Sequence, residues 1–195
     1  MALGGIVKGK RTTLRTPTED DLPTYARWMA DVRIRHAGPI WHEPAMPATW
    51  KDRFKEQAKD QRAVLWSIET EGRLIGLARA RLGGIEGPPN AHLQHFMLDP
   101  EEWRKGYGWN AALALHRYFF DYLDLKRSAF ELRADNTAAL RIAEKLGYTE
   151  FGRGHEVFYR DGAYVDEVWL VMERATWDER WAGSEREYAP LGAGR

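Results

Sequence analysis

The first half of the chain places short apolar runs between turn signals, a pattern typical of successive antiparallel strands. Polar and apolar residues alternate in the first run, and Glu71-Gly72 between the second and third runs predicts a hairpin turn. A Gly- and Pro-rich connection over residues 83–90 separates the third run from the fourth. We therefore predict strands at residues 10–15, 63–68, 74–82 and 91–98.

Helical periodicity interrupts this pattern in two places. Thr18 followed by Asp21 is a helix-start signal, because a hydroxyl at the first position can cap an unpaired backbone amide. Four apolar residues then follow at the i, i+3, i+4 and i+7 spacing of one helix face: Leu22, Tyr25, Ala26 and Met29. Residues 38–47 are rich in Pro and Gly and predict a loop, and residues 49–59 predict a second helix.

The second half of the chain changes to alternating strands and helices. Residues 106–122 carry one apolar face and predict a helix, and residues 128–132 alternate like a strand. A further helix ends at Gly147, a residue typical of a helix C-terminal cap. This strand–helix–strand order predicts a parallel strand pair within an otherwise antiparallel sheet.

A hairpin and a polar tail close the sequence. Asp161-Gly162 predicts the tight turn of a hairpin between residues 155–159 and 164–172. Past Trp177 the sequence becomes polar and Gly-rich, and no internal repeat or break in composition marks a second domain. We predict one domain over residues 7–177 and a loose tail over residues 178–195.

Composition excludes several classes of function. The 195 residues are 44% hydrophobic and 30% charged, as in an ordinary globular domain. Lys plus Arg and Asp plus Glu both number 29, so the basic surplus of a nucleic-acid binder is missing. With no cysteine, disulfides, thiolate metal sites and a Cys nucleophile are excluded, and nothing indicates another metal site. We find no signal-peptide pattern and no apolar run near the roughly 18 residues that cross a bilayer, so we expect a cytoplasmic protein without membrane partners.

The most informative stretch is DPEEWRKGYGWNAA, residues 99–112, between a predicted strand and a predicted helix. Gly106 and Gly108 let the backbone approach a ligand and leave amide N–H groups exposed at the helix start. Those donors and the positive end of the helix dipole favour a phosphate or pyrophosphate. Arg104 and Lys105 add positive charge beside it. A glycine pair before a helix is equally compatible with a simple tight turn.

The same glycines also suggest a dinucleotide site. Gly106, Gly108 and Ala111 satisfy the pattern G-x-G-x-x-A. That interpretation needs a parallel sheet and several further strand–helix units. Here four strands of antiparallel character come first and only one further helix follows, so the context argues against a nicotinamide-dependent oxidoreductase.

Four stretches of the chain resemble the GNAT superfamily of N-acetyltransferases, and within it the RimJ/RimL-like branch of ribosomal-protein alanine N-acetyltransferases. They are KGKRTTLRTPTEDDL for the opening strand and first helix, LDPEEWRKGYGWNAAL for the pyrophosphate loop, ADNTAALRIAEKLGY for the next helix and FYRDGAYVDEVWLV for the closing hairpin. The resemblance extends from about Val7 to Trp177. It implies an α/β (α+β) fold with a mixed, mostly antiparallel sheet of about seven strands, helices on both faces, and strands 4 and 5 splayed apart. It also implies transfer of acetyl from acetyl-CoA to a primary amine, which is either a small molecule or a protein N-terminus.

The resemblance assigns positions to the co-substrate. Six consecutive backbone amides would hold the CoA pyrophosphate: Arg104, Lys105, Gly106, Tyr107, Gly108 and Trp109. The pantetheine arm would lie in the gap between the splayed strands, alongside Phe96, Met97 and Leu98, with the Phe96 amide donating to the thioester carbonyl. Asn136 would hydrogen-bond the pantetheine, and a helix N-cap role is compatible with that contact.

Direct attack on a thioester needs a neutral amine and therefore a proton acceptor. Several family members have a Glu near the start of the fourth strand, where this chain has His92. An imidazole can accept the proton directly or through water, although an ordinary strand histidine would give the same sequence. By two-residue alternation, Gln94 shares a face with His92 and His95 lies on the other face.

The family's general acid has no counterpart here. Many relatives have a Tyr four residues before the helix-ending Gly, and the ribosomal-protein enzymes a Ser three residues after the Asn. These positions are Ala143 and Ala139 in this chain. A thiolate whose thiol pKa is about 8.5, as for free Cys, can leave unaided, and Tyr148 and Tyr159 are alternative acids. The missing hydroxyls also keep open a non-catalytic acyl-CoA sensor.

We expect the acceptor pocket between residues 27–59, the connection at 83–90 and the final hairpin. Its candidate lining residues are Trp41, His42, Glu43 and Trp66. A polyamine or an aminoglycoside site should present several carboxylates, for which the candidates are Glu43 and Glu86. By analogy with the family, the protein would be a homodimer.

Overall fold

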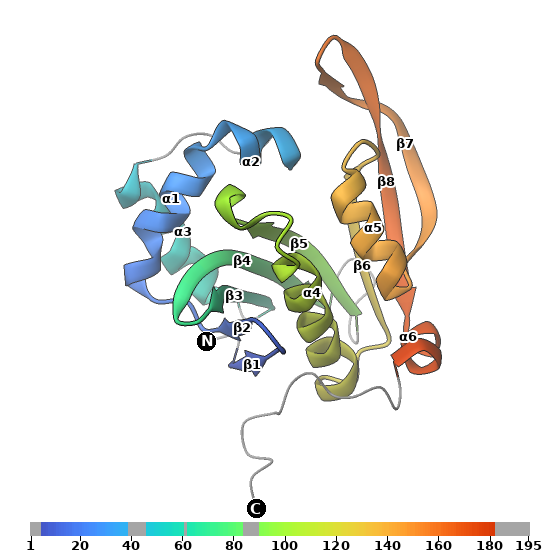
Figure 1. The fold of residues 1–195 in the computed structure, drawn as a ribbon, viewed down its shortest axis with the longest axis horizontal. Coiled ribbons are helices and arrows are strands. Elements are labelled where there is room, and N and C mark those ends of the chain that lie inside the picture. Colours follow the sequence, from blue (N-terminus) through green and yellow to red (C-terminus); the bar gives the residue numbers. More distant parts are fainter. Residues whose placement is uncertain (1–4, 39–45, 61, 84–89, 182–195) are drawn as a thin grey trace, which may run out of the picture.

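A single mixed sheet of eight strands runs through the molecule (Figure 1). The computed structural model describes residues 5–38, 46–60, 62–83 and 90–181. The strand order is β1-β2-β3-β4-β5-β6-β8-β7. In chain order the strands are β1 (Val7–Lys8), β2 (Thr13–Arg15), β3 (Ala63–Thr70), β4 (Arg73–Leu82), β5 (Asn90–Leu98), β6 (Arg127–Arg133), β7 (Thr149–Arg160) and β8 (Ala163–Glu173).

The helices flank this sheet. The α-helices are α1 (Leu22–Ala30), α2 (Val32–Ala37), α3 (Pro47–Lys59), α4 (Tyr107–Arg117), α5 (Thr137–Leu146) and α6 (Arg174–Trp181). Shorter turns precede or extend three of the elements: the 3-10 turns η1 (Glu19–Asp21) and η2 (Pro100–Glu102), and the π-helical turn η3 (Tyr118–Tyr122). None of the described helices is both long and apolar enough to cross a membrane.

The strand pairing confirms the predicted mixed sheet. Every pair of neighbours is antiparallel except β5 and β6, which are parallel and connected through α4. The first strand predicted at residues 10–15 is shorter than expected, Thr13–Arg15, because Gly9 N donates to Thr12 O in a turn that covers residues 9–12. A further short strand, Val7–Lys8, precedes that turn and pairs with Thr13–Arg15. This extra strand makes eight where about seven were expected. A doubly wound dinucleotide-binding sheet is excluded by this topology.

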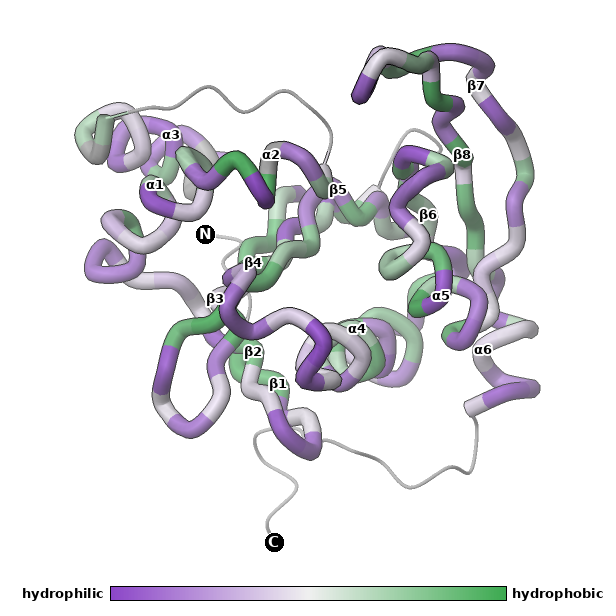
Figure 2. The backbone as a smooth tube through the Cα atoms, turned by 45° about the horizontal axis from the view of Figure 1, so that its top comes forward, coloured by the Kyte–Doolittle hydropathy of each residue, from purple (hydrophilic) through white to green (hydrophobic). Residues whose placement is uncertain are grey.

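The two faces of the sheet carry separate apolar clusters. On β3, Leu65 packs under α1 and α3 while Trp66 belongs to the larger cluster under α4 and α5; on β4, Leu77 and Ala78 alternate in the same way. Figure 2 shows hydrophobic stretches in the central strands and in α4, with hydrophilic stretches along the outer helices. The confirmed arrangement, helices on both faces, follows from this alternation.

The parallel pair is short, and this shapes the site. β5 and β6 pair only through Asn90, Ala91 and His92, opposite residues 127–129. Beyond His92 the two strands diverge (Figure 1), so β5 has no strand neighbour on that side among the described residues. Counting the β1–β2 hairpin as one strand, this is the splay between strands 4 and 5 that the family resemblance implied.

The C-terminal half adds two features that periodicity did not predict. The helix expected over 106–122 is an α-helix only to Arg117 and continues as a π-helical turn. α6 follows β8 and buries Trp177, whose Nε1 donates to Asp121 Oδ1 at 2.6 Å. The predicted turn at Asp161-Gly162 is confirmed, with both residues at positive φ, 47° and 86°. The expected loose tail falls largely on residues 182–195, outside the described part of the chain, and its first residues belong to α6.

Candidate active site

The start of α4 forms an open cradle of backbone donors. Gly106 is the N-cap residue and has φ 85°, in the left-handed region, with no side chain capping the helix. The first intrahelical bond runs from Asn110 N to Gly106 O, so the amides of Tyr107, Gly108 and Trp109 have no carbonyl acceptor within the helix. These N–H groups and the helix dipole fit a pyrophosphate, which agrees with the sequence prediction.

Gly106 and Gly108 differ in how much room the surrounding protein leaves for a side chain. A Cβ on Gly106 would lie 3.0 Å from Arg11 Nη1 and would add backbone strain at its positive φ. A Cβ on Gly108 would meet only ordinary contacts, with Ile142 and Leu98 at 3.5 and 3.6 Å. Gly106 is therefore needed for the turn itself, whereas protein packing leaves room for a Cβ at Gly108.

Two further cations lie at this cradle, and sequence reasoning missed both. Arg11 Nη1 donates to Lys105 O at 2.8 Å, and its guanidinium lies 4.6 Å from the Tyr107 ring centroid. Lys145 Nζ, from α5, lies 3.7 Å from the centroid of the Trp109 ring. Arg104 is exposed beside them. The positive charge thus comes from three segments that the fold brings together.

Buried Asn110 explains how Arg11 reaches the cradle. Its Oδ1 accepts hydrogen bonds from Arg11 N, Thr12 N and Thr12 Oγ1, at 2.8–2.9 Å. One side chain in the first turn of α4 therefore holds the β1–β2 hairpin in place. No local sequence signal marked Asn110, because its partners lie about a hundred residues away in the chain.

The backbone of β5 faces the gap left by the splay. Asp99 N donates to Ile75 O, which makes that pair a hydrogen-bonded one. By the two-residue alternation of the antiparallel ladder, the Phe96 and Leu98 backbone groups then point away from β4, toward the β6 side. Trp103 Nε1 donates to Leu98 O at 2.9 Å on that side. The N–H of Phe96 is thus directed into the gap where the pantetheine arm is expected.

A β-bulge changes which side chains of β5 share a face. His95 pairs with Arg79 and Leu93 with Ala80, so Gln94 is the extra residue. Since His92 pairs with Arg81, His92 and His95 both lie on the face of Arg79 and Arg81, under α1 and α3. The prediction that His95 points to the opposite face was wrong, because strict alternation does not survive a bulge.

His92 has a carboxylate partner across the splay. Its Nε2 lies 2.6 Å from Glu131 Oε2 on β6. The His92 side chain is 24% exposed and that of Glu131 35% exposed, so the pair is partly shielded but open to solvent. It sits where β5 and β6 part, at the inner end of the gap. Glu131 was not singled out from the sequence, since nothing local to it indicates a partner on another strand.

Asn136 caps α5, as its helix N-cap interpretation predicted. Its Oδ1 accepts from Ala139 N at 3.2 Å, and its Nδ2 donates to Ala37 O at 2.9 Å, at the end of α2. Arg133 donates to His36 O and Gly38 O in the same place. These bonds tie the end of α2 to β6 and α5.

The two tyrosines considered as general acids differ in placement. Tyr148 is buried, and its hydroxyl lies 2.6 Å from His116 Nε2 and 2.7 Å from Ser128 Oγ, within the core under α4 and α5. Burial also raises its pKa well above the usual range. Tyr148 is therefore not an accessible proton donor. Tyr159 is exposed on β7, with its ring against Tyr164.

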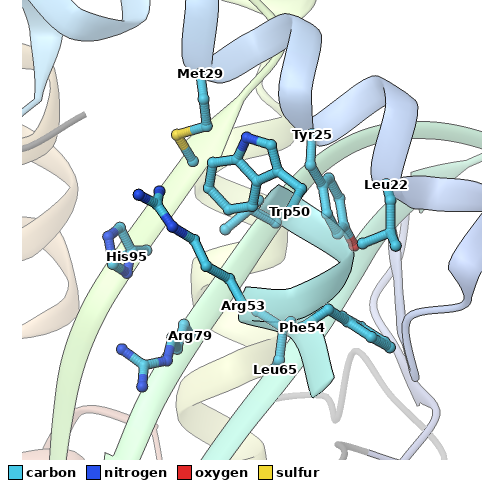
Figure 3. A pocket seen from close by; sticks show the side chains of 10 residues that line it. Leu22, Tyr25, Met29, Trp50, Arg53, Phe54, Leu65, Arg79 and His95 are labelled. Carbon is cyan, nitrogen blue, oxygen red and sulfur yellow. The ribbon is translucent and has the colours of Figure 1, made fainter. Parts of the chain in front are cut away.

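A cavity of about 270 Å³ opens between α1, α3 and strands β3–β5 (Figure 3). Its apolar wall is formed by Leu22, Tyr25, Met29, Phe54, Leu65 and Leu77. Trp66 does not line it, contrary to expectation: it is fully buried on the other face, edge-on to Tyr118 and Phe119. The remaining candidates, Trp41, His42, Glu43 and Glu86, lie outside the described residues.

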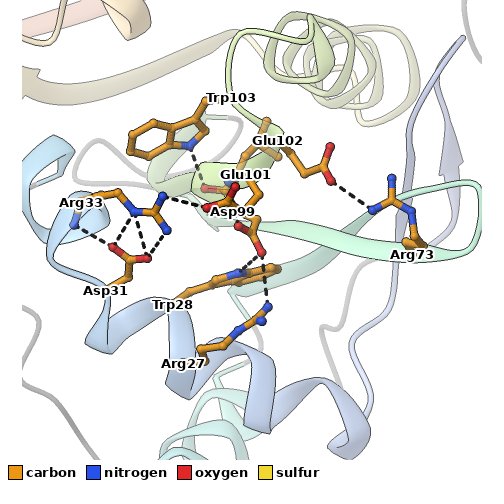
Figure 4. A network of polar contacts seen from close by, with 10 residues as sticks. Arg27, Trp28, Asp31, Arg33, Arg73, Asp99, Glu101, Glu102 and Trp103 are labelled. Carbon is orange, nitrogen blue, oxygen red and sulfur yellow. Dashed lines mark hydrogen bonds and ion pairs between the residues drawn. The ribbon is translucent and has the colours of Figure 1, made fainter.

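Polar contacts fasten α1 and α2 to the segment that follows β5 (Figure 4). Asp99 accepts from Trp28 Nε1 at 2.8 Å and from Arg27 Nη2 at 3.3 Å. Arg33 on α2 forms a 2.8 Å ion pair with Glu101. The segment between β5 and α4 therefore connects the helices beside the cavity to the cradle of backbone donors at the start of α4.

An open helix start, a gap between parted strands and a histidine at the inner end of that gap are features expected of a CoA-dependent acyltransferase. A sequence model of the acetyltransferase (GNAT) domain matches residues 11–149. The chain therefore belongs to the GNAT acetyltransferase family and is an N-acetyltransferase, with acetyl-CoA as its co-substrate.

Similar proteins agree with this assignment. An SPbeta prophage-derived N-acetyltransferase of Bacillus subtilis is 22% identical over 171 residues, 85% of this chain and 92% of that protein. The alpha/beta-tubulin-N-acetyltransferase 9 of Mus musculus is 23% identical over 186 residues, covering 88% and 77%. The spermidine N-acetyltransferase of Vibrio cholerae, solved with CoA and spermine, superposes with a TM-score of 0.75 at 20% identity and covers 86% of this chain and 98% of its own.

Proposed function

We propose that the protein acetylates a primary amine by direct attack on acetyl-CoA, with His92 as the general base. The observation that carries this proposal is the 2.6 Å contact between His92 and Glu131 at the inner end of the gap. When the carboxylate accepts from Nε2–H, the other ring nitrogen, Nδ1, is left as a proton acceptor. Glu131 would also stabilise the imidazolium that forms.

The proposed step uses the backbone of β5 as well. The amine nitrogen bonds to the acetyl carbon, its proton passes to His92 directly or through water, and the carbon–sulfur bond breaks to release the CoA thiolate. The Phe96 N–H would donate to the acetyl oxygen as negative charge develops there. The amides and cations of residues 104–109 would hold the pyrophosphate, with Met97 and Leu98 beside the arm and Asn136 near it.

No protein acid is assigned to the leaving sulfur. The positions at which relatives have a hydroxyl are Ala139 and Ala143. We propose that the thiolate departs unaided or takes its proton from water.

The acceptor amine is either a small molecule or a protein N-terminus. The motif resemblance favours the ribosomal-protein alanine branch, whereas the solved neighbours include enzymes named for spermidine. Both acceptor classes need the same base and the same acetyl donor. The homodimer implied by the resemblance stays a prediction, which light scattering on the purified protein would test.

The test is release of CoA thiol from acetyl-CoA in the presence of amines: spermidine, an aminoglycoside, amino acids and an alanine-initiated peptide. We expect at least one amine to be acetylated in step with thiol release. His92→Gln should lower kcat about 100-fold, because a positioned base contributes on that order. His155→Gln, an exposed histidine on β7, serves as the control. No turnover above the uncatalysed rate would favour the acyl-CoA sensor, and an active His92→Gln would place the base elsewhere.

A further inference from the structure

The cavity between α1 and α3 lies on the same face of the sheet as His92. Its floor includes Arg79 on β4 and His95 on β5, and the next pair along these strands on that face is Arg81 with His92. His95 directly precedes Phe96, whose N–H faces the gap. The cavity is therefore placed to hold the remainder of an acceptor whose amine reaches His92.

Arginines dominate the polar part of the cavity lining. Arg79, Arg53 and His95 all line it, and the Arg53 side chain extends from α3 toward His95 (Figure 3). The guanidinium of Arg53 lies 5.3 Å from the Trp50 ring centroid. Among the described lining residues there is no carboxylate. A polyamine would place two or more positive charges beside these arginines, with no carboxylate among the described lining residues to pair with them.

Arg79 has no counter-ion within the described part of the chain. It is half-buried, and its Nε is shielded from solvent without a hydrogen-bond partner there. Burial lowers its pKa; the negative charge of Asp60 opposes this shift in part, and the positive charge of Arg81 adds to it. A half-buried guanidinium without a partner is costly in free energy, and a bound carboxylate would satisfy it with two charge-assisted hydrogen bonds.

We propose that this cavity selects an amino-acid-like acceptor, an amine that also bears a carboxylate and an apolar side chain, with Arg79 binding the carboxylate. The volume of about 270 Å³ lies at the small end for ligand sites and suits a molecule of this size. Tyr25, Phe54 and Leu77 would contact the apolar side chain. The positive field of the arginines also favours the neutral, reactive form of the amine.

This inference rests on the proposed amine acetylation and narrows its substrate. The experiment compares kcat/KM for three matched pairs, each an amino acid and the same amine without its carboxylate. The pairs are phenylalanine with phenylethylamine, leucine with isoamylamine, and tryptophan with tryptamine, and spermidine is a separate arm. The variants are Arg79→Gln, Arg79→Lys and, as a control, Arg62→Gln, since Arg62 is exposed and does not line the cavity.

We expect the preferred amino acid to exceed its decarboxylated partner at least 10-fold. Arg79→Gln should lower kcat/KM for the amino acid about 10- to 100-fold, the range for a hydrogen-bonded charge, and leave the partner amine within about twofold. Arg79→Lys should retain part of the selectivity. A preference for spermidine or for the decarboxylated amines, or an unchanged Arg79→Gln, overturns the inference and leaves the proposed acetylation intact.

A lack of turnover with every amine would instead count against the proposed function. Titration calorimetry of the same pairs, in the presence of CoA, then decides the inference separately. Selective binding of an amino acid that Arg79→Gln abolishes supports a carboxylate site at Arg79. Equal or undetectable binding of both members of every pair overturns it.

Discussion

His92 and Glu131 lie on the two strands that part to form the site, and their side chains meet at 2.6 Å across the last residue pair that holds these strands together. The orientation of the proposed base, His92, therefore depends on how β5 and β6 are paired. A histidine at this position is oriented only while β5 and β6 keep their register, and the carboxylate selects which ring nitrogen carries the proton.

Glu131→Gln should lower kcat about 10- to 100-fold while the KM for acetyl-CoA stays unchanged. The amide preserves size but cannot stabilise an imidazolium or fix its orientation, so the loss falls on the chemical step. Steady-state kinetics with the best amine give the measurement. Glu150→Gln, a strand glutamate paired with Arg153, is the control and should stay within twofold. A rise in KM for acetyl-CoA without a change in kcat would mean that Glu131 acts on binding alone.

Gly106→Ala should weaken acetyl-CoA binding, whereas Gly72→Ala should not. Both glycines have left-handed φ, 85° and 74°, so each substitution costs about 1–2 kcal/mol of folding free energy. Only Gly106 lies at the phosphate cradle, where the new Cβ would press on Arg11, and nothing lies within 4 Å of a Cβ on Gly72.

Chemical denaturation and calorimetric titration of these two variants separate the effects. Equal losses of acetyl-CoA affinity in both would show that general destabilisation, rather than the cradle, is responsible. A normal affinity in Gly106→Ala would contradict the placement of the pyrophosphate.

Much of the fold could be predicted from local patterns. The β3–β4 hairpin, the α5 cap at Gly147 and the closing hairpin each depend on residues within one turn or one strand pair, and the structure confirms them. α2 and α6 were missed, since their few apolar residues pack against distant segments. The π-helical turn after Arg117 also gives no separate sequence signal.

The sequence predicted the part of the candidate site that is formed by the backbone at the start of α4. Gly106 and its neighbours form the predicted helix start, because that geometry depends on residues close together in the sequence. Side-chain partners were harder: Glu131, Arg11 and Lys145 reach the site through pairings that no local pattern encodes. The β-bulge at Gln94 reversed the expected face of His95, because one added residue shifts every later position on a strand.

Acidification should destabilise the protein through His116. This histidine is buried, its Nδ1 lies 2.7 Å from Ala112 O, and burial lowers its pKa to about 4. The unfolded chain binds the proton near pH 6.5, so stability is complete above that pH and is lost as pH falls toward 4. The loss from this group amounts to about 3 kcal/mol.

Urea denaturation at several pH values measures this effect. The wild type should lose stability between pH 6.5 and 4 more steeply than His116→Gln, while the exposed His155→Gln should follow the wild type. Parallel curves for the wild type and His116→Gln would show that another group titrates in this range.

Asp21→Asn should destabilise the fold by about 3 kcal/mol, as expected for breaking a buried ion pair. The buried Asp21 carboxylate accepts from Arg15 at 2.7 and 2.8 Å and from Ser67 at 2.7 Å, linking β2, β3 and the start of α1. Glu56→Gln removes an exposed pair with Lys59 and should cost less than about 1 kcal/mol. Denaturant midpoints test both, and similar costs would contradict a structural role for the Asp21 cluster.

The most direct test of the mechanism is the initial-velocity pattern for acetyl-CoA and the preferred amine, with each varied at several fixed concentrations of the other. Direct attack within a ternary complex predicts double-reciprocal lines that intersect. Parallel lines, the sign of a covalent acetyl-enzyme intermediate, would contradict the account.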